Sequence, residues 1–435
     1  MGAQTAVPPA RAAGEKEVPA ARSAGALFEL AAFLAALLIL FLRRPDALLN
    51  AQFYAEDGAR WFADAYHVGW RCLALPDSGY LQTVSRLIGL LCQLFPFAVV
   101  PLVMNLFALF FQILPINILL SERFADIPRK IRLASSLLYL SIPNSFETHA
   151  NTTNIQWHLA LACGLWLVSE APGNRLLLYG EWLLLTLSVL DGPAGMLLLP
   201  VAAALWWQRR DRRSFAALTI LASGSLVQAL VLVLSHSRRP APNGATLTRF
   251  VEIVGGQVFL SSVLGLRTSI QLFFAHVEWL VLAQGAALLV GLAVVAYALF
   301  RGPLQLKLFV FYAYLSLALA LIHPVASFGA EQPQWQLLVT PGVANRYYLL
   351  PMLAFFASLI WMAADDRPGR KLARYGAITV LALLPVGIAR DWRYKPFVDY
   401  NFKSFAAEFE RAEPGTTVSI PINPDWQLVL VKHRR

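Results

Sequence analysis

Apolar segments that recur along the whole chain constrain its fold more than any other feature of the sequence. Hydrophobic residues occupy 57% of the 435 positions and charged residues only 14%, whereas soluble domains carry about 25% charged residues. Many of the segments approach the ~20 apolar residues that a helix needs to cross a hydrocarbon core. The sequence therefore predicts an all-α polytopic membrane protein.

About eleven membrane-spanning helices are predicted from these segments, several of them short. Residues 84–97 are expected to form a helix at the outer interface instead, because a further crossing there would export the basic clusters that follow. The predicted spans are residues 26–42, 98–120, 131–143, 156–169, 175–190, 194–207, 214–235, 275–300, 306–322, 347–364 and 373–388.

The positive charge, +10 net, is concentrated in short loops between the predicted spans. Basic residues in such loops mark the cytoplasmic side of a membrane protein, which places the amino terminus inside and the carboxyl-terminal tail outside the cytoplasm. The longer segments expected outside are residues 43–97, 144–155, 236–274, 323–346 and 389–435. A nucleic-acid groove requires a different, patch-like distribution, so nucleic acid is not an expected partner. The clusters are Arg123, Arg129, Lys130 and Arg132; Arg209, Arg210, Arg212 and Arg213; and Arg367, Arg370, Lys371 and Arg374.

Three regions are expected along the chain. Residues 1–25, rich in Ala, Pro and charge, form a disordered cytoplasmic tail. Residues 26–388 form the transmembrane domain, which includes a long outer loop at 43–97. Residues 389–435 form a small α+β appendage on the outer face, because apolar residues repeat at helical spacing over 402–409 and two short strands follow around an Asn-Pro-Asp turn.

An acidic pair, Glu56 and Asp57, lies among aromatic residues shortly after the first predicted span. On a helix, Glu56 would pair with Arg60 four positions later, whereas Asp57 has no such partner. Two interpretations of Asp57 remain open. It caps an interfacial helix that begins at Gly58, since Asp is a favoured N-cap residue, or it is a functional carboxylate; one residue can serve both purposes.

The segment NSFETHANTTNIQWHLAL, residues 144–161, concentrates polar side chains between two predicted spans. Polar residues at a membrane edge carry an energetic cost unless they are paired or used. Asn and Gln amides suit sugar hydroxyls, and a Trp offers a flat apolar face for a sugar ring. A solvated loop with incidental polarity is the alternative. The candidate binding residues are His149, Asn154, Gln156, Trp157 and His158.

No metal site is assigned from the sequence. Glu147, His149 and His158 carry ligating groups, but their spacing matches no tight metal-binding signature. The three cysteines form neither a disulfide framework nor a metal-binding spacing. A divalent metal is therefore an alternative without support in the sequence.

Arg346 and Tyr347 lie in PGVANRYYLLP, residues 341–351, at the outer mouth of a predicted span. An Arg guanidinium binds phosphate oxygens in a bidentate fork, so Arg346 is a candidate for holding a phosphate, as is Arg86 in the interfacial segment. The alternative is interfacial anchoring, by an aromatic belt for Tyr347 and by a snorkelling side chain for Arg346.

An amino-terminal span, an outer loop that opens with YAEDG, about eleven spans and a small outer carboxyl-terminal domain together resemble the GT-C superfamily. Its members are integral membrane glycosyltransferases that take sugars from polyprenyl-phosphate carriers. The resemblance implies that the acidic pair supplies the catalytic carboxylate, that residues 84–97 correspond to a juxtamembrane helix, and that NRYYLLP corresponds to an Arg-Tyr motif of bacterial members. The second outer loop departs from the superfamily pattern, because Glu147 stands there without a paired acid.

The expected function is transfer of a sugar from a polyprenyl-phosphate donor to an envelope glycan, lipid or protein acceptor, on the outer face of a bacterial inner membrane. Attack by an acceptor hydroxyl on the anomeric carbon needs a base. Asp57 is expected to be that base, with Glu56 held by Arg60 or assisting, and with Arg86 or Arg346 holding the phosphate. The expected partners are this donor, membrane lipids and the acceptor.

A transporter or flippase of a lipid-linked glycan is the alternative function. A transporter needs ionisable or polar residues within its spans. Here the polar clusters lie at the outer ends of the predicted spans, apart from Glu181 and Gln228, which favours chemistry at one face.

Overall fold

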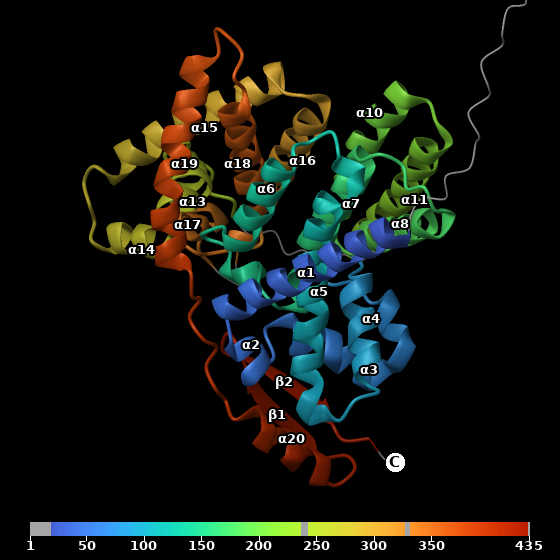
Figure 1. The fold of residues 1–435 in the computed structure, drawn as a ribbon. Coiled ribbons are helices and arrows are strands. Elements are labelled where there is room, and N and C mark those ends of the chain that lie inside the picture. The colour runs from blue at the N-terminus through green and yellow to red at the C-terminus, as the bar shows by residue number, and fades with distance from the viewer. Residues whose placement is uncertain (1–18, 236–241, 327–330, 434–435) are drawn as a thin grey trace, which may run out of the picture.

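The computed structural model describes residues 19–235, 242–326 and 331–433, with side chains from residue 27 onward. This part of the chain is mostly helical, and a helical bundle carries a two-stranded sheet and one further helix at its lower end (Figure 1). Residues 1–18 of the predicted disordered tail lie outside the described residues, and the first helix begins at Pro19.

The bundle is built from helices of 4 to 25 residues. Proline occupies the first or second position of α5, α9 and α10, where a helix needs no backbone N–H donor. The longer helices are α1 (Pro19–Arg43), α5 (Val100–Leu120), α8 (Arg175–Val189), α11 (Arg212–Ser235), α15 (Leu280–Arg301), α16 (Leu304–Ile322), α18 (Leu349–Ala364) and α19 (Lys371–Asp391). The shorter ones are α2 (Asp46–Leu49), α3 (Ala63–Val68), α4 (Thr83–Cys92), α6 (Arg129–Ser141), α7 (Ile155–Val168), α9 (Pro193–Met196), α10 (Leu199–Arg209), α12 (Leu247–Phe250), α13 (Ser261–Leu264), α14 (Leu266–Phe274), α17 (Gln334–Val339) and α20 (Phe402–Arg411).

Seven helical segments of the described chain are long and apolar enough to cross a membrane, which indicates a membrane protein. Six of them coincide with predicted spans. Helices also form at the other five predicted spans, but α6, α7, α8 and α10 contain only 11 to 15 residues, shorter than the ~20 that a hydrocarbon core requires. The count of eleven spans is therefore not confirmed. The seven segments are Phe97–Leu120, Arg212–Ser235, Leu247–Leu264, Leu280–Arg301, Leu304–Ile322, Asn345–Ala364 and Lys371–Asp391.

The segment Leu247–Leu264 corrects the prediction that residues 236–274 form an outer loop. Its Gly, Gln and Ser residues dilute an apolar pattern, yet the segment is one continuous helix that packs closely on α15. A Cβ atom at Gly255 would lie 2.1 Å from the carbonyl oxygen of Gln284, so the contact requires glycine.

Both ends of this segment lie at the same end of the bundle. Asn243, just before the segment, donates to the carbonyl of Ile322 at the end of α16 (3.0 Å). The amide of Leu266, just after it, donates to the Asp391 carboxylate at the end of α19 (2.6 Å). The helices α16 and α19 both end on this side, because Arg346 at the start of α18 bonds to Val325 after α16 and α19 returns antiparallel to α18. The segment therefore adds a long apolar helix without reversing the direction of the helices that follow.

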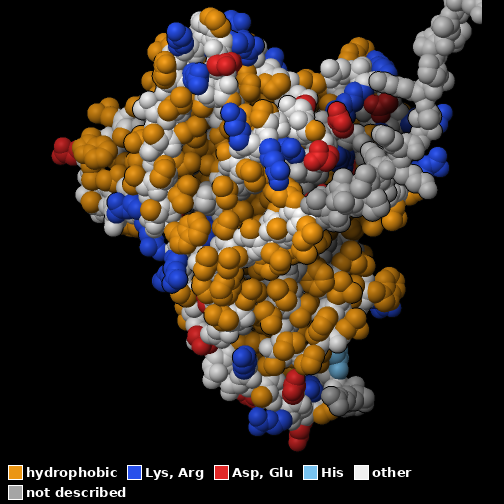
Figure 2. Space-filling model, viewed as in Figure 1, with side chains coloured by type: hydrophobic (Ala, Val, Ile, Leu, Met, Phe, Trp, Pro, Cys, Tyr) orange, Lys and Arg blue, Asp and Glu red, His pale blue; other side chains and the backbone are white. Residues whose placement is uncertain are grey.

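We call this end of the bundle the cavity face and the opposite end the basic face. The basic face carries the loops between α5 and α6, between α10 and α11, and between α18 and α19 (Figure 1). Lys and Arg side chains gather along the corresponding upper rim in Figure 2. The three basic clusters thus share one end, as the sequence predicted.

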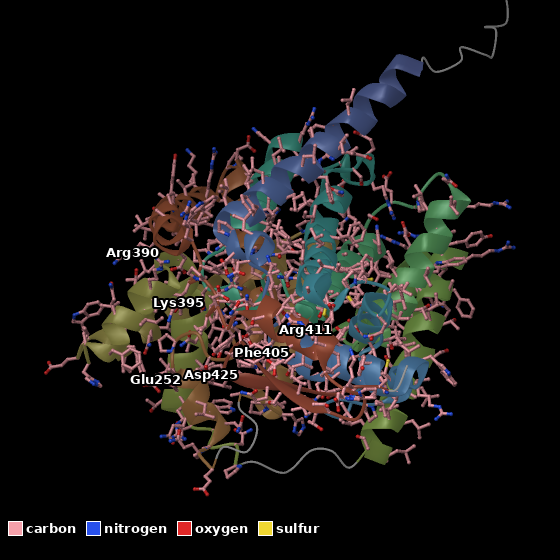
Figure 3. The ribbon with its side chains drawn as sticks, turned by 90° about the horizontal axis from the view of Figure 1, so that it is seen from below. Glu252, Arg390, Lys395, Phe405, Arg411 and Asp425 are labelled. Carbon is pink, nitrogen blue, oxygen red and sulfur yellow. The ribbon has the colours of Figure 1, made fainter. Side chains whose placement is uncertain are left out.

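The carboxyl-terminal appendage forms as predicted, with α20 packed on a hairpin of β1 (Thr417–Ile422) and β2 (Trp426–Val431). The strands are antiparallel, with Thr417 opposite Val431 and Ile422 opposite Trp426. Phe402 and Phe409 of α20 are buried. Figure 3 shows Phe405 and Arg411 on α20 and Asp425 at the hairpin turn, in a view onto the cavity face.

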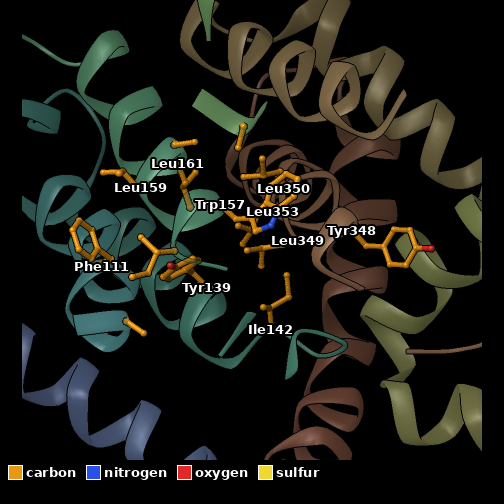
Figure 4. Packing of buried hydrophobic residues seen from close by; sticks show 14 of the residues in the cluster. Phe111, Tyr139, Ile142, Trp157, Leu159, Leu161, Tyr348, Leu349, Leu350 and Leu353 are labelled. Atoms are coloured by element: carbon orange, nitrogen blue, oxygen red, sulfur yellow. The ribbon is translucent and has the colours of Figure 1, made fainter. Parts of the chain in front are cut away.

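The bundle core is formed where α7 packs against α18. Trp157 and Leu161 face Leu349, Leu350 and Leu353 in Figure 4, and all five are buried. Lipid tails are as apolar as these side chains, so close packing, rather than removal from water, holds such helices together. This contact also fixes Trp157 at the cavity face.

Candidate functional site

A cavity of about 530 Å³ opens at the cavity face and is lined by segments far apart in the sequence. The three predicted outer segments, at 43–97, 144–155 and 323–346, all contribute to it. The polar lining includes Tyr54, Glu56, Asp77, Glu147, Asn154, Gln156, Arg346 and Tyr347, of which Gln156 and Tyr347 are the first residues of predicted spans. Helices supply an apolar lining that includes Met196, Leu197, Leu232, Leu319 and Ala320.

Glu56 lines the cavity, and its side chain is half-buried. Burial raises the pKa of Glu56 to about 7, although Arg346 acts in the opposite direction. The predicted pair with Arg60 is wrong, because Arg60 lies 3.7 Å from Asp77 (Nε to Oδ1). The physical reason is that Asp77, from a later part of the same loop, brings a second carboxylate to the exposed Arg60 guanidinium. Helical spacing within residues 56–60 carries no information about such a competitor.

Asp57 does not line the cavity and is fully buried. Its carboxylate accepts four hydrogen bonds, from the amide and hydroxyl of Thr152 (3.0 and 2.6 Å) and from those of Thr153 (both 2.8 Å). Burial raises the pKa of Asp57 to about 6, while these four bonds act to lower it. Asp57 therefore caps the short helix Thr152–Asn154 that leads into α7, and not the helix beginning at Gly58.

Arg346 lies in the cavity wall and is paired with Glu147. Its guanidinium and its backbone amide both donate to the Glu147 carboxylate, and the guanidinium also donates to the carbonyl of Val325 (2.6 Å). It stacks 4.9 Å from the centre of the Tyr347 ring. The positive charge is thus held in place, with 24% of its side chain exposed.

Asn154, Gln156 and Trp157 line the cavity with polar atoms that lack partners. Among the described residues, no hydrogen bond reaches the side-chain oxygens of Asn154 and Gln156 or the indole nitrogen of Trp157, although all three atoms are buried. Buried polar atoms are seldom left unpaired. One donor and two acceptors of residues in the cavity wall therefore have no partner within the described part of the chain.

Three other predicted binding residues do not line the cavity. His158 bonds to the Tyr139 hydroxyl (2.7 Å) and the Thr148 carbonyl (2.8 Å), which is the pattern of a core histidine. His149 is buried, with its ring 5.1 Å from that of Tyr394. The third is Arg86, which is also buried.

Arg86 is held by two neighbours and serves the packing of the outer loop. Its guanidinium lies 2.7 Å from the Asp64 carboxylate and 5.1 Å from the centre of the Trp61 ring. We expect Arg86→Ala to lower the stability of the protein by roughly 2–3 kcal/mol, because the half-exposed Asp64 regains only part of its hydration when a buried pair is broken. Thermal unfolding in detergent measures this, and an unchanged melting temperature would contradict it.

The sequence did not identify Asp77, Pro424 or Trp426 as cavity residues. Pro424 and Trp426 belong to the hairpin turn. Two backbone hydrogen bonds between Asn423 and residues 53–55 join this turn to the loop before Glu56. No local pattern connects segments about 370 positions apart. The only available signal was a Trp beside a turn in a polar region.

The described residues contain no group of three or more His, Cys, Asp or Glu side chains that could hold a metal ion. The sequence matches no known protein-family model and no curated protein.

Proposed function

We propose that this protein is a membrane glycosyltransferase that moves a sugar from a polyprenyl-phosphate donor to an envelope glycan, lipid or protein acceptor. The observation that carries the proposal is the composition of the cavity. One wall offers a half-buried carboxylate, a fixed guanidinium and three unpaired polar atoms, and another is apolar and built from helix ends. A lipid-linked phosphosugar has the same three parts: apolar chain, phosphate and polyol.

We assign the roles differently from the expectation based on sequence, because Glu56 and not Asp57 lines the cavity. Glu56 faces the cavity with a pKa near 7, which suits a general base close to neutral pH. It takes the proton of the acceptor hydroxyl as the oxygen bonds to the anomeric carbon. The bond between that carbon and the phosphate oxygen breaks, and the phosphate leaves with the electron pair.

Arg346 supports the leaving phosphate, and Glu147 fixes its orientation. A guanidinium stabilises the charge that develops on a departing phosphate, and Arg346 is the described arginine that lines this cavity. Asn154, Gln156 and Trp157 bind the sugar through their unpaired polar atoms. Asp57 acts as a positioning residue, since it holds the short helix Thr152–Asn154, which carries Asn154 and leads directly into Gln156 and Trp157 on α7.

Glu181 and Gln228, the two side chains that the sequence singled out inside the predicted spans, give no support to a transport path. Gln228 bonds to both backbone groups of Leu81 (2.9 and 3.2 Å), and Glu181 is paired with Arg123 and Arg213. Both residues are therefore occupied in structural contacts. A transporter would need such groups free to bind and release its cargo.

Mass spectrometry of envelope glycans from a strain that lacks the gene tests the proposal. A glycan, lipid or protein missing one sugar is the expected result, and a wild-type copy, but not a Glu56→Gln copy, should restore it. Accumulation of a complete lipid-linked precursor inside the cell would instead indicate a flippase and overturn the proposal.

The raised pKa of Glu56 predicts opposite effects of pH on activity and on stability. Activity should fall about tenfold per pH unit below pH 7, because a protonated Glu56 cannot accept a proton. Stability changes with pH in the opposite direction. Burial disfavours the ionised form of Glu56, so its contribution to stability is greatest below the pKa of the unfolded state and is lost as pH rises towards 7. Glu56→Gln should therefore unfold at or above the wild-type temperature at pH 8. A pH–rate profile and melting curves at pH 5 and 8 measure both effects, and a flat profile would contradict the assignment.

A further inference from the structure

The basic face holds a second polar cavity, of about 550 Å³, far from the proposed active site. It lies where α5, α7, α10 and α11 meet their loops, and its lining includes Arg123, Arg209, Arg212 and Arg213. Three acidic residues also line it, but all three are exposed at the rim. One of them, Asp211, already accepts bonds from the amide and hydroxyl of Ser214.

Two arginines at the base of this cavity share a single carboxylate. Arg123 and Arg213 both pair with Glu181, and their side chains are only 17%, 15% and 8% exposed, respectively. The cluster carries one positive charge in excess. The Nη2 atom of Arg123 is buried and has no hydrogen-bond partner in the described part of the chain. A buried, charged donor without an acceptor is costly, so this nitrogen favours an anionic acceptor.

An apolar cavity of about 430 Å³ adjoins the basic one. The two share the lining residues Phe124, Asp126, Ile127, Val168 and Gln305. The apolar cavity extends between α5, α6, α7, α16 and α18, and Tyr139, Leu161 and Leu353 in its wall are labelled in Figure 4.

Two buried polar atoms belong to the wall of the apolar cavity. Neither the Nε atom of Arg132 nor the hydroxyl of Ser136 has a hydrogen-bond partner among the described residues. The other end of Arg132 is fixed, because its Nη1 atom donates to the carbonyls of Leu120 (3.0 Å) and Ser121 (2.7 Å). These two unpaired donors suit carbonyl oxygens at the junction between a charged head group and apolar chains.

We propose that the joined cavities bind one anionic glycerophospholipid of the surrounding membrane. Its phosphate lies against Arg123, Arg212 and Arg213, its ester carbonyls meet Arg132 and Ser136, and its acyl chains occupy the apolar cavity. Arginine clusters beside membrane helices attract anionic lipid head groups. The site is independent of sugar transfer, because it lies at the opposite end of the bundle from Glu56.

The test compares phosphatidylglycerol with phosphatidylcholine on the purified full chain in detergent, by thermal unfolding and by native mass spectrometry. Phosphatidylglycerol should raise the melting temperature by at least about 3 °C and remain bound as one molecule per chain. Phosphatidylcholine should do neither.

Two variants locate the site without breaking the Glu181 cluster. Arg212→Gln removes an exposed arginine of the lining, and Ala357→Phe fills the apolar cavity; each should reduce the shift by half or more. Arg210→Gln is the matched control, since Arg210 is the neighbouring exposed arginine and stacks on Trp206 and Trp207 outside the cavity.

Three results would overturn the proposal. Equal shifts with both lipids would show that charge is not recognised. An unchanged response in both Arg212→Gln and Ala357→Phe would place the lipid elsewhere. A shift produced by polyprenyl phosphate but not by phosphatidylglycerol would assign the cavities to a different lipid class.

Discussion

Glu56→Gln is expected to lower kcat for sugar transfer by about 10²–10⁴-fold, the usual contribution of a general base. The change keeps the size of the side chain and removes its ability to take a proton. The fold should survive, because no ion pair to Glu56 is found among the described residues and burial already disfavours its charge. Steady-state kinetics on the purified variant, with melting curves as the check on folding, measure the effect.

Glu56→Asp and Glu147→Gln serve as matched comparisons. The shorter Glu56→Asp keeps a base but withdraws it from the acceptor, so part of the activity should return. Glu147→Gln removes the partner of Arg346 and should act mainly on use of the phosphate-bearing donor. A fully active Glu56→Gln protein would remove the main residue-level support for the proposed function.

Asp57→Asn is expected to destabilise the protein by about 2–4 kcal/mol at pH 7, above the pKa of about 6 at which Asp57 ionises. Hydrogen bonds to a charged acceptor contribute about 1.5–3 kcal/mol each, against about 0.5–1.5 for neutral ones. An amide keeps one oxygen for the four donors of Thr152 and Thr153 and turns its own NH₂ group towards another. Activity should fall together with stability.

A double-mutant cycle with Thr153→Val separates this structural role from catalysis. Removing one of the four donors should cost less in the Asp57→Asn background than in the wild type, because the two groups share one contact. Strictly additive losses of stability would contradict the contact. An Asp57→Asn protein that is stable but inactive would indicate that Asp57, and not Glu56, is the general base.

The comparison of the two carboxylates shows how far a local pattern can lead. The sequence singled out Glu56 and Asp57 as a pair and left Asp57 divided between a cap and a catalytic group. In the structure Asp57 caps a helix, but one that lies nearly a hundred residues further along the chain. Glu56 lines the cavity. Neighbours in sequence reach different surroundings because successive residues of a helix are rotated by about 100° around its axis.

The apolar segments by themselves determined that the chain forms a helical membrane protein with its basic loops at one end, because hydropathy and charge are local properties of the sequence. The same kind of pattern predicted α20 and the hairpin. Tertiary structure alone decided which polar residues face a common space. Arg86 is drawn to Asp64, His158 to Tyr139, and Trp426 to the loop before Glu56, through contacts between distant segments. Such contacts depend on how helices pack, and periodicity within one segment carries no information about them.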